Sequence, residues 1–228
     1  MSQSDALLFA ALARVAELRL GDFKLQELAN TAWAFATSSQ QDAQLFAALA
    51  RVAELRLGDF SVQELANTAW AFATASQQDA QLFAALAREA ELRLGNFKVP
   101  ELANTAWAFA TASQQDAQLF AALARVAELR LGDFKVQELA NTAWAFATAS
   151  QQDAQLFAAL ARVAELRLGN FKVQELANTV WAFATASQQG AQLFAALARV
   201  SELRLGDFNL QGLANTAWAF ATASQQDA

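Results

Sequence analysis

The chain has 228 residues, a formal net charge of −6 and a hydrophobic content of 55%, and it contains neither Cys nor His. Without these residue types, disulfides, thiolate nucleophiles, imidazole bases and the usual zinc sites are excluded, so we predict no metal or redox cofactor. The negative charge disfavours a protein whose whole surface attracts phosphate, although a basic groove can coexist with an acidic exterior.

The most apolar part of the chain does not predict a membrane span. The longest stretch without a charge, Leu176 to Ala198, is interrupted by polar residues and by Gly190, which is typical of a helix, a turn and a second helix. Only Met1 to Ser4 precede the first repeat, so neither a signal peptide nor a transit peptide is predicted in this sequence. We therefore expect either a cytosolic location or a targeting segment that this sequence lacks.

One stretch, Gln63 to Ala75 (QELANTAWAFATA), returns almost unchanged six times along the chain. Its tryptophan recurs every 37 residues, and six copies of that length run from Asp5 to Gln226. A fixed period of this kind predicts one elongated repeat domain over 5–226. Its repeats are 5–41, 42–78, 79–115, 116–152, 153–189 and 190–226.

The first half of each repeat predicts a helix, which we name the A helix. In the second copy, Asp42 is a candidate N-cap, because its carboxylate can accept from the free N–H groups of the first turn. From Ala43 to Leu57 the apolar residues follow the spacing of one helical face. Gly58 is then expected to end the helix as a left-handed C-terminal cap.

The second half predicts another helix, the B helix. Ser61 and Glu64 form a capping-box pattern at its start. The Ser position is Lys in four copies and Asn209 in the sixth, and Pro100 fits the first turn of the helix in the third copy. We expect Ser76, Gln77 and Gln78 to form the turn into the next repeat. The predicted buried stripe has Trp70 on its edge and consists of Val62, Leu65, Ala66, Ala69, Phe72 and Ala73.

Each repeat is thus a helical hairpin that is too poor in apolar surface to stand alone and rich enough to stack on its neighbours. The predicted fold is all-α, a right-handed α-solenoid of six 37-residue hairpins with one layer of A helices and one of B helices. The handedness follows from analogy with other arrays of helical hairpins.

The period and the B-helix text ELANTAWAFAT resemble the octotricopeptide and heptatricopeptide repeats, whose consensus carries a similar ELANTAWALA-like core. The resemblance covers all six copies and implies RNA binding and RNA maturation in chloroplasts or mitochondria, with about one nucleotide for each repeat. This chain departs from the family in its acidic charge, in lacking a recognisable C-terminal RNA-associated domain and in its nearly identical copies. Uniform copies predict a homopolymeric or repetitive target of about six nucleotides.

Candidate RNA contacts come from the A-helix face opposite the core, where Gln44 and Arg51 lie two turns apart. Such side chains can hydrogen-bond base edges and hold phosphates, so we expect them to line a groove. The alternative is a solvated face on which Arg51 pairs with Glu54. The Gln row is Gln44, Gln81, Gln118, Gln155 and Gln192, with Leu7 in the first copy, and the Arg row is Arg14, Arg51, Arg88, Arg125, Arg162 and Arg199.

Other repeated residues are weaker candidates for ligand binding. A Lys row at the B-helix starts, formed by Lys24, Lys98, Lys135 and Lys172, is a candidate phosphate track or simply solvent-exposed. Asn67 is expected to bond a backbone group of a turn, and Trp70 to pack between repeats rather than stack on bases. Arg56 is expected near the C-terminal end of the A helix with its charge reaching solvent, and it is assigned no ligand.

Two functions follow from these observations. The first is single-stranded RNA binding, and the alternative is a protein-interaction or self-assembling scaffold that stacks head to tail through uncapped solenoid ends. An enzyme is not expected, because catalysis needs an asymmetric group of residues and each carboxylate here has repeated, equivalent surroundings.

Overall fold

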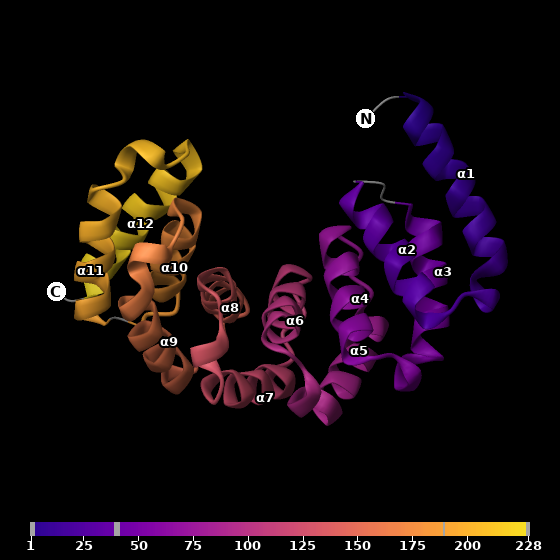
Figure 1. Ribbon diagram of the computed structural model, residues 1–228, viewed down its shortest axis with the longest axis horizontal. Helices are drawn as coiled ribbons and strands as arrows, with labels where there is room; N and C mark the ends of the chain where they lie inside the picture. The colour runs from indigo at the N-terminus through magenta and orange to yellow at the C-terminus, as the bar shows by residue number, and fades with distance from the viewer. Residues whose placement is uncertain (1–2, 39–41, 189, 227–228) are drawn as a thin grey trace. The chain divides into compact units, whose positions relative to one another are not determined.

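The computed structural model describes residues 3–38, 42–188 and 190–226, and all the regular secondary structure in those ranges is helical (Figure 1). The A helices are α1 (Gln3–Arg19), α3 (Ala43–Glu54), α5 (Ala80–Arg93), α7 (Ala117–Glu128), α9 (Ala154–Arg167) and α11 (Ala191–Glu202). The B helices are α2 (Leu25–Thr37), α4 (Val62–Thr74), α6 (Val99–Thr111), α8 (Val136–Thr148), α10 (Val173–Thr185) and α12 (Leu210–Gln226). A short 3-10 turn, such as Leu57–Asp59, precedes each B helix.

The two helices of a repeat are held together by a pair of phenylalanines. Phe46 of α3 and Phe72 of α4 meet edge to face with ring centroids 5.1 Å apart, and both are buried. The equivalent pairs of the other repeats have the same geometry, at 5.0 to 5.8 Å. Phe60, which follows the 3-10 turn, is also buried and fills the space beside this pair. An A helix and a B helix thus form one hairpin, as the sequence predicts.

The hairpins stack side by side in two layers. The chain divides into two compact units, Met1–Leu119 and Phe120–Ala228. In the first unit α2, α4 and α6 pack in a row, with α1, α3 and α5 beside them. In the second, α8, α10 and α12 pack in a row, with α9 and α11 beside them. The B helices pack more closely than the A helices, because small alanines face their neighbours. The predicted all-α solenoid of hairpins is confirmed.

The start of the A helix agrees with the prediction and its end does not. Asp42 accepts hydrogen bonds from the backbone N–H groups of Gln44 and Leu45 at 3.1 and 3.0 Å, so it is the N-cap. The predicted left-handed cap at Gly58 is wrong, since no glycine in the described ranges has a positive φ. Instead the backbone tightens after Glu54, and Gly58 lies inside the 3-10 turn.

The B helices begin with a capping box that is complete in one repeat and half-formed in the others. The Ser61 hydroxyl accepts from the backbone N–H of Glu64 at 3.2 Å, and the Glu64 carboxylate accepts from that of Ser61 at 2.7 Å. Where Lys replaces Ser, only the Glu half forms, because Lys has no acceptor. In the sixth repeat Asn209 supplies the other half by accepting from the N–H of Gly212.

In four repeats the left-handed residue is a serine at the end of the B helix. Ser76 has φ 56°, its N–H donates to the carbonyl of Ala73, and the N–H of Gln77 donates to that of Phe72. This pair of bonds is the Schellman motif, which usually places glycine at the left-handed position. Ser113, Ser150 and Ser187 share the conformation.

Two substitutions test which residue is left-handed, because a left-handed Gly58 would give the opposite changes in stability. Ser76→Gly removes the strain of a left-handed Cβ and is expected to raise the free energy of unfolding by about 0.5–1 kcal/mol.

Gly58→Ala is expected to raise the free energy of unfolding by about 0.4–1 kcal/mol, because it restricts the unfolded chain. A Cβ at Gly58 would also meet no atom within 4 Å. Urea unfolding measures both changes, and a loss of stability in Gly58→Ala would contradict the assignment.

Candidate nucleic-acid interface

The outermost stripe of each A helix carries the residues that the sequence analysis selected. Gln44, Ala47, Arg51 and Leu55 follow one another at helical spacing on α3, and all four are exposed. Every member of the Gln and Arg rows is exposed in the same way. These rows therefore lie on the solvent-exposed side of the A helices, which we call the outer face of the A layer.

The guanidinium groups of the Arg row have no partner within the described part of the chain. The alternative that paired Arg51 with Glu54 is not what the structure shows, since Glu54 instead accepts a hydrogen bond from the Gln81 side chain at 2.7 Å. The six arginines therefore present their charge to solvent. Gln81 is engaged by this contact between repeats, whereas Gln44, Gln118, Gln155 and Gln192 make no side-chain bond to described residues.

An exposed leucine stands one helical turn beyond each arginine of the row. Leu55 is 87% exposed, and its equivalents Leu18, Leu92, Leu129, Leu166 and Leu203 are 80 to 87% exposed. The helical spacing from Arg51 already places this leucine on the same stripe, a signal that the prediction of the Gln and Arg rows did not use. The outer face of the A layer is thus a mixture of cations and apolar side chains.

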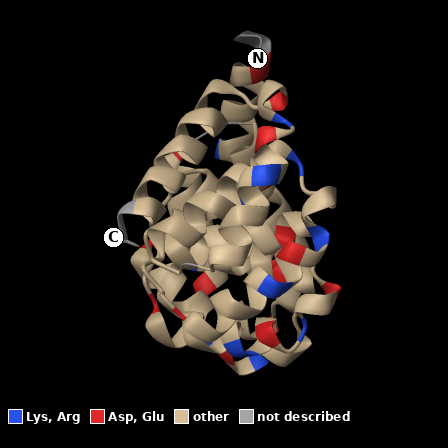
Figure 2. Ribbon diagram, turned by 90° about the vertical axis from the view of Figure 1, so that its left-hand side faces the viewer, with Lys and Arg blue, Asp and Glu red and all other residues tan. Residues whose placement is uncertain are grey.

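The Lys row lies elsewhere, at the starts of the B helices. Lys24, Lys98, Lys135 and Lys172 are exposed N-cap residues, and only their backbone N–H groups are bonded, to the first-turn glutamate. Their ammonium groups make no ion pair with described residues. Figure 2 shows charged residues of both signs interspersed along the ribbon, so local rows matter more here than one large field.

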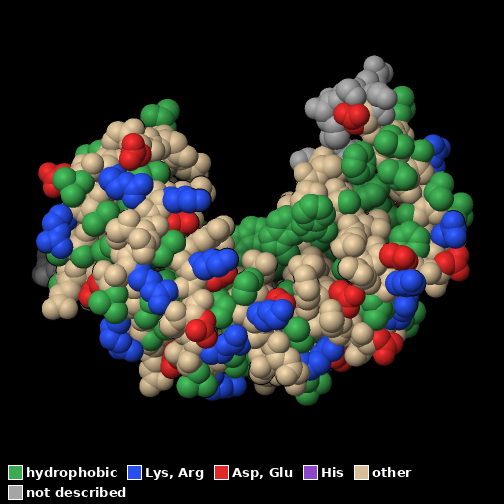
Figure 3. All heavy atoms as spheres, in the orientation of Figure 1, with side chains coloured by type: hydrophobic (Ala, Val, Ile, Leu, Met, Phe, Trp, Pro, Cys, Tyr) green, Lys and Arg blue, Asp and Glu red, His purple; other side chains and the backbone are tan. Residues whose placement is uncertain are grey.

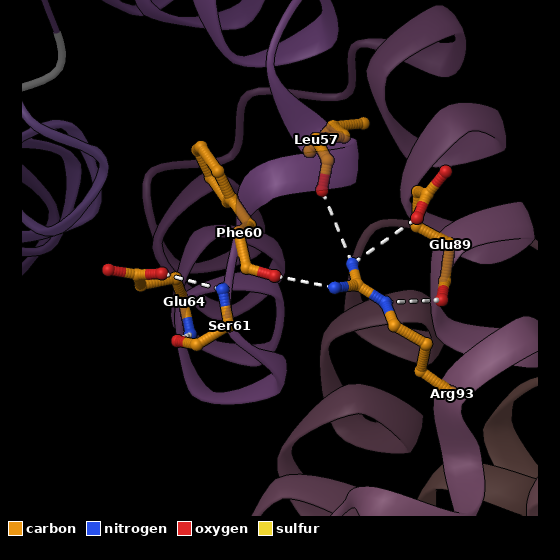
Figure 4. A network of polar contacts seen from close by, with 6 residues as sticks. All are labelled: Leu57, Phe60, Ser61, Glu64, Glu89 and Arg93. Atoms are coloured by element: carbon orange, nitrogen blue, oxygen red, sulfur yellow. Dashed lines mark hydrogen bonds and ion pairs between the residues drawn. The ribbon is translucent and has the colours of Figure 1, made fainter.

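A second set of arginines joins neighbouring repeats and is not available to a ligand. Arg93 donates to the carbonyl oxygens of Phe60 and Leu57 at 2.6 and 3.2 Å and pairs with Glu89 at 3.3 Å (Figure 4). Arg56, Arg167 and Arg204 reach the carbonyls of Phe23, Phe134 and Phe171 in the preceding repeat. We call these residues the clamp arginines. The prediction that Arg56 only extends its charge to solvent is wrong, because the preceding repeat supplies an unpaired carbonyl.

The open face of the B layer carries a different and uncharged set of side chains. Gln63, Asn67, Trp70 and Thr74 recur at helical spacing on α4, on the side opposite the buried stripe. Trp70 and Trp107 stack with ring centroids 6.2 Å apart, while Trp144 and Trp181 at 6.4 Å and Trp181 and Trp218 at 6.5 Å are tilted against each other. The predicted packing of tryptophans between repeats is therefore present, but the row is only half-buried.

The Asn residues beside the tryptophans are not tied to a turn. Within the described ranges, the side chain of Asn67 and of its equivalents Asn30, Asn104, Asn141, Asn178 and Asn215 makes no hydrogen bond. The expectation that Asn67 bonds a turn is therefore wrong, and the turn that follows the B helix is closed by backbone bonds of Ser76 and Gln77. Asn178 and Asn215 line a cavity of about 310 Å³ between α10 and α12, together with Gln174 and Gln211.

The sequence was compared with known proteins. A family model described as RESC6, RNA-editing substrate-binding complex 6 protein, matches residues 3–228. No curated protein matches the sequence. Among the helices described, none combines the length and the apolar character that crossing a bilayer requires.

The clamp is testable by comparing two arginines of the same helix. Arg93→Met keeps the apolar stem but removes the donor of the Phe60 carbonyl, while the Leu57 carbonyl still accepts from the backbone N–H of Phe60. We expect it to lower the free energy of unfolding by about 1.5–3 kcal/mol, as for other hydrogen bonds to charged groups. Arg88→Met, on the exposed row, should stay within about 0.5 kcal/mol. Equal stability of the two variants in urea would show that the clamp contributes nothing.

Proposed function

Since the chain belongs to the RESC6 family of RNA-editing substrate-binding complex 6 proteins, we propose that it binds single-stranded RNA along its repeats. The family description connects the chain with RNA and with a protein complex. The resemblance to octotricopeptide repeats adds a finer proposal of about one nucleotide for each repeat.

The observation that carries the proposal is the division of the cations into two kinds. The clamp arginines are bonded to backbone carbonyls, whereas the Arg and Lys rows are exposed and have no ion pair among the described residues. Exposed cations repeated at the spacing of the repeats can follow a phosphate backbone. The sequence pattern favoured the Arg row as this track, and the Lys row is the other candidate.

Uniform repeats support a uniform target. Because every repeat offers nearly the same side chains, neighbouring repeats are expected to prefer the same base. A homopolymeric or repetitive single strand satisfies all copies at once, by analogy with repeat proteins that read one base per repeat. The acidic net charge of −6 limits non-specific attraction, so binding depends on the local rows.

Two charge-reversal variants test RNA binding and separate the two rows. One carries Arg51, Arg88, Arg125 and Arg162 changed to Glu, and the other Lys24, Lys98, Lys135 and Lys172 changed to Glu. Both change the net charge equally, so long-range repulsion is matched and a difference between them reports local contact. We expect wild-type binding to single-stranded homopolymers to weaken with salt, and at least one variant to lose about tenfold in affinity at low salt.

The slope of log affinity against log salt should also become shallower, by about 0.7 for each phosphate of a single strand that the variant no longer neutralises. Fluorescence anisotropy at several salt concentrations measures both quantities, and circular dichroism checks that the variants remain folded. Wild-type protein without salt-sensitive binding, or two variants that bind as well as wild type, would overturn the proposal.

A second candidate function, a self-assembling scaffold, is favoured by the apolar face of α1. Leu7, Leu8, Leu12 and Val15 are 48 to 69% exposed on this helix. A cavity of about 720 Å³ is lined by Leu12 and Val15 together with Phe9 and residues of α2. Exposed apolar clusters of this kind mark protein interaction sites, and we propose a second copy of the chain as the occupant.

Light scattering across a range of protein concentrations tests self-association. We expect the mass to rise with concentration, and the double change Leu8→Glu and Leu12→Glu to hold the protein monomeric by placing charges in the contact. The control is Leu55→Glu with Leu92→Glu, which alters equally exposed leucines on the outer face of the A layer. A concentration-independent monomer in the wild type would exclude this function.

A further inference from the structure

The open face of the B layer has side chains that the fold itself does not use. Asn has a lower helix propensity than Ala, and an amide held half-buried without a partner is unfavourable. The row from Asn67 to Asn215 nevertheless places such an amide in the middle of each of these B helices, with no hydrogen bond in the described part of the chain, and the equivalent Asn30 is exposed. Packing gives no reason for a carboxamide at this position.

The surroundings of the Asn row are suited to nucleobases. Each Asn lies one turn from a half-buried tryptophan, and Figure 3 shows hydrophobic side chains gathered over α4 and α6, where two of these helices lie side by side. A carboxamide offers a donor and an acceptor to a base edge, and aromatic rings offer stacking surface. In the second unit, two amides of the row and two glutamines line the same cavity of about 310 Å³, which Asp207 also lines.

The Lys row lies at the N-terminal edge of this same face. Lys98 and Lys172 cap α6 and α10, so their ammonium groups stand at the helix ends from which the Asn and Trp rows extend. Past the first-turn glutamate, the B helices contain no charged residue. A phosphate backbone can thus follow the lysines while its bases lie over an uncharged surface. The Arg row on the A layer instead alternates with exposed leucines.

We propose that the open face of the B layer reads the bases of single-stranded RNA, with the Asn row on base edges, the Trp row against base faces and the Lys row on phosphates. This rests on the proposed RNA binding and assigns it to one face. The tryptophans assigned to packing between repeats then have a second role at their exposed edges. Of the two charge-reversal variants, the lysine variant is expected to lose the greater affinity.

A matched pair of amide variants tests base reading. The first changes Asn67, Asn104, Asn141 and Asn178 to Ala, and the second changes Gln44, Gln118, Gln155 and Gln192 to Ala on the outer face of the A layer. Both remove four amides that make no hydrogen bond to described residues. We expect wild type to rank oligo(A), oligo(U) and oligo(C) differently. The Asn variant should lose about tenfold or more for the preferred strand and bind all three alike, while the Gln variant keeps the ranking.

Intrinsic fluorescence gives an independent readout of the face. All 6 tryptophans of the chain occupy this one position and there is no tyrosine, so a change in emission on adding RNA reports contact at the B layer. Emission that does not change while anisotropy shows binding, or an Asn variant that keeps affinity and ranking, would overturn the inference and leave RNA binding in place. Wild type that binds none of the strands would overturn both proposals.

Discussion

The edge-to-face contact between the two phenylalanines of each repeat sets the geometry on which the other contacts depend. Phe46 and Phe72 fix how an A helix lies on its B helix, and the same pair recurs with nearly constant spacing. A hairpin fixed in this way presents a flat, alanine-rich side to the next hairpin, so the B helices approach closely. Close approach of the B helices brings successive tryptophans into contact and leaves the A helices farther apart.

Stacking of hairpins also determines which charged groups remain available. A turn placed against the next A helix exposes carbonyl groups that need a donor, and the clamp arginine supplies it with a charge-assisted bond. The arginine five residues earlier lies on the opposite side of the helix and stays free. One residue type thus has two roles in the repeats that carry a clamp arginine, and its position on the helix separates them. The distinction carries the functional proposal, because only a free cation can hold a phosphate.

The sequence predicts features that depend on near neighbours and misses those that depend on distant ones. Asp42, the Ser61–Glu64 box and Pro100 lie within a turn of the groups they satisfy, and the structure confirms each of them. Arg93 contacts a carbonyl 33 residues away, a distance at which no pattern within one repeat gives a signal. The turn at Ser76 is where the sequence places it, but the left-handed cap was assigned to Gly58 because glycine is the commonest left-handed residue, whereas the Schellman bonds here stabilise a serine instead.

The acidic net charge overstates how negative the accessible surface is. Asp42, Asp79, Asp116 and Asp153 accept from backbone N–H groups at the starts of A helices, and most first-turn glutamates do the same at the starts of B helices. A carboxylate held at a helix N-terminus is partly compensated by the helix dipole. The lysines and row arginines have no such compensation and face solvent. A chain with a formal charge of −6 can therefore present uncompensated cations at regular intervals to a phosphate backbone.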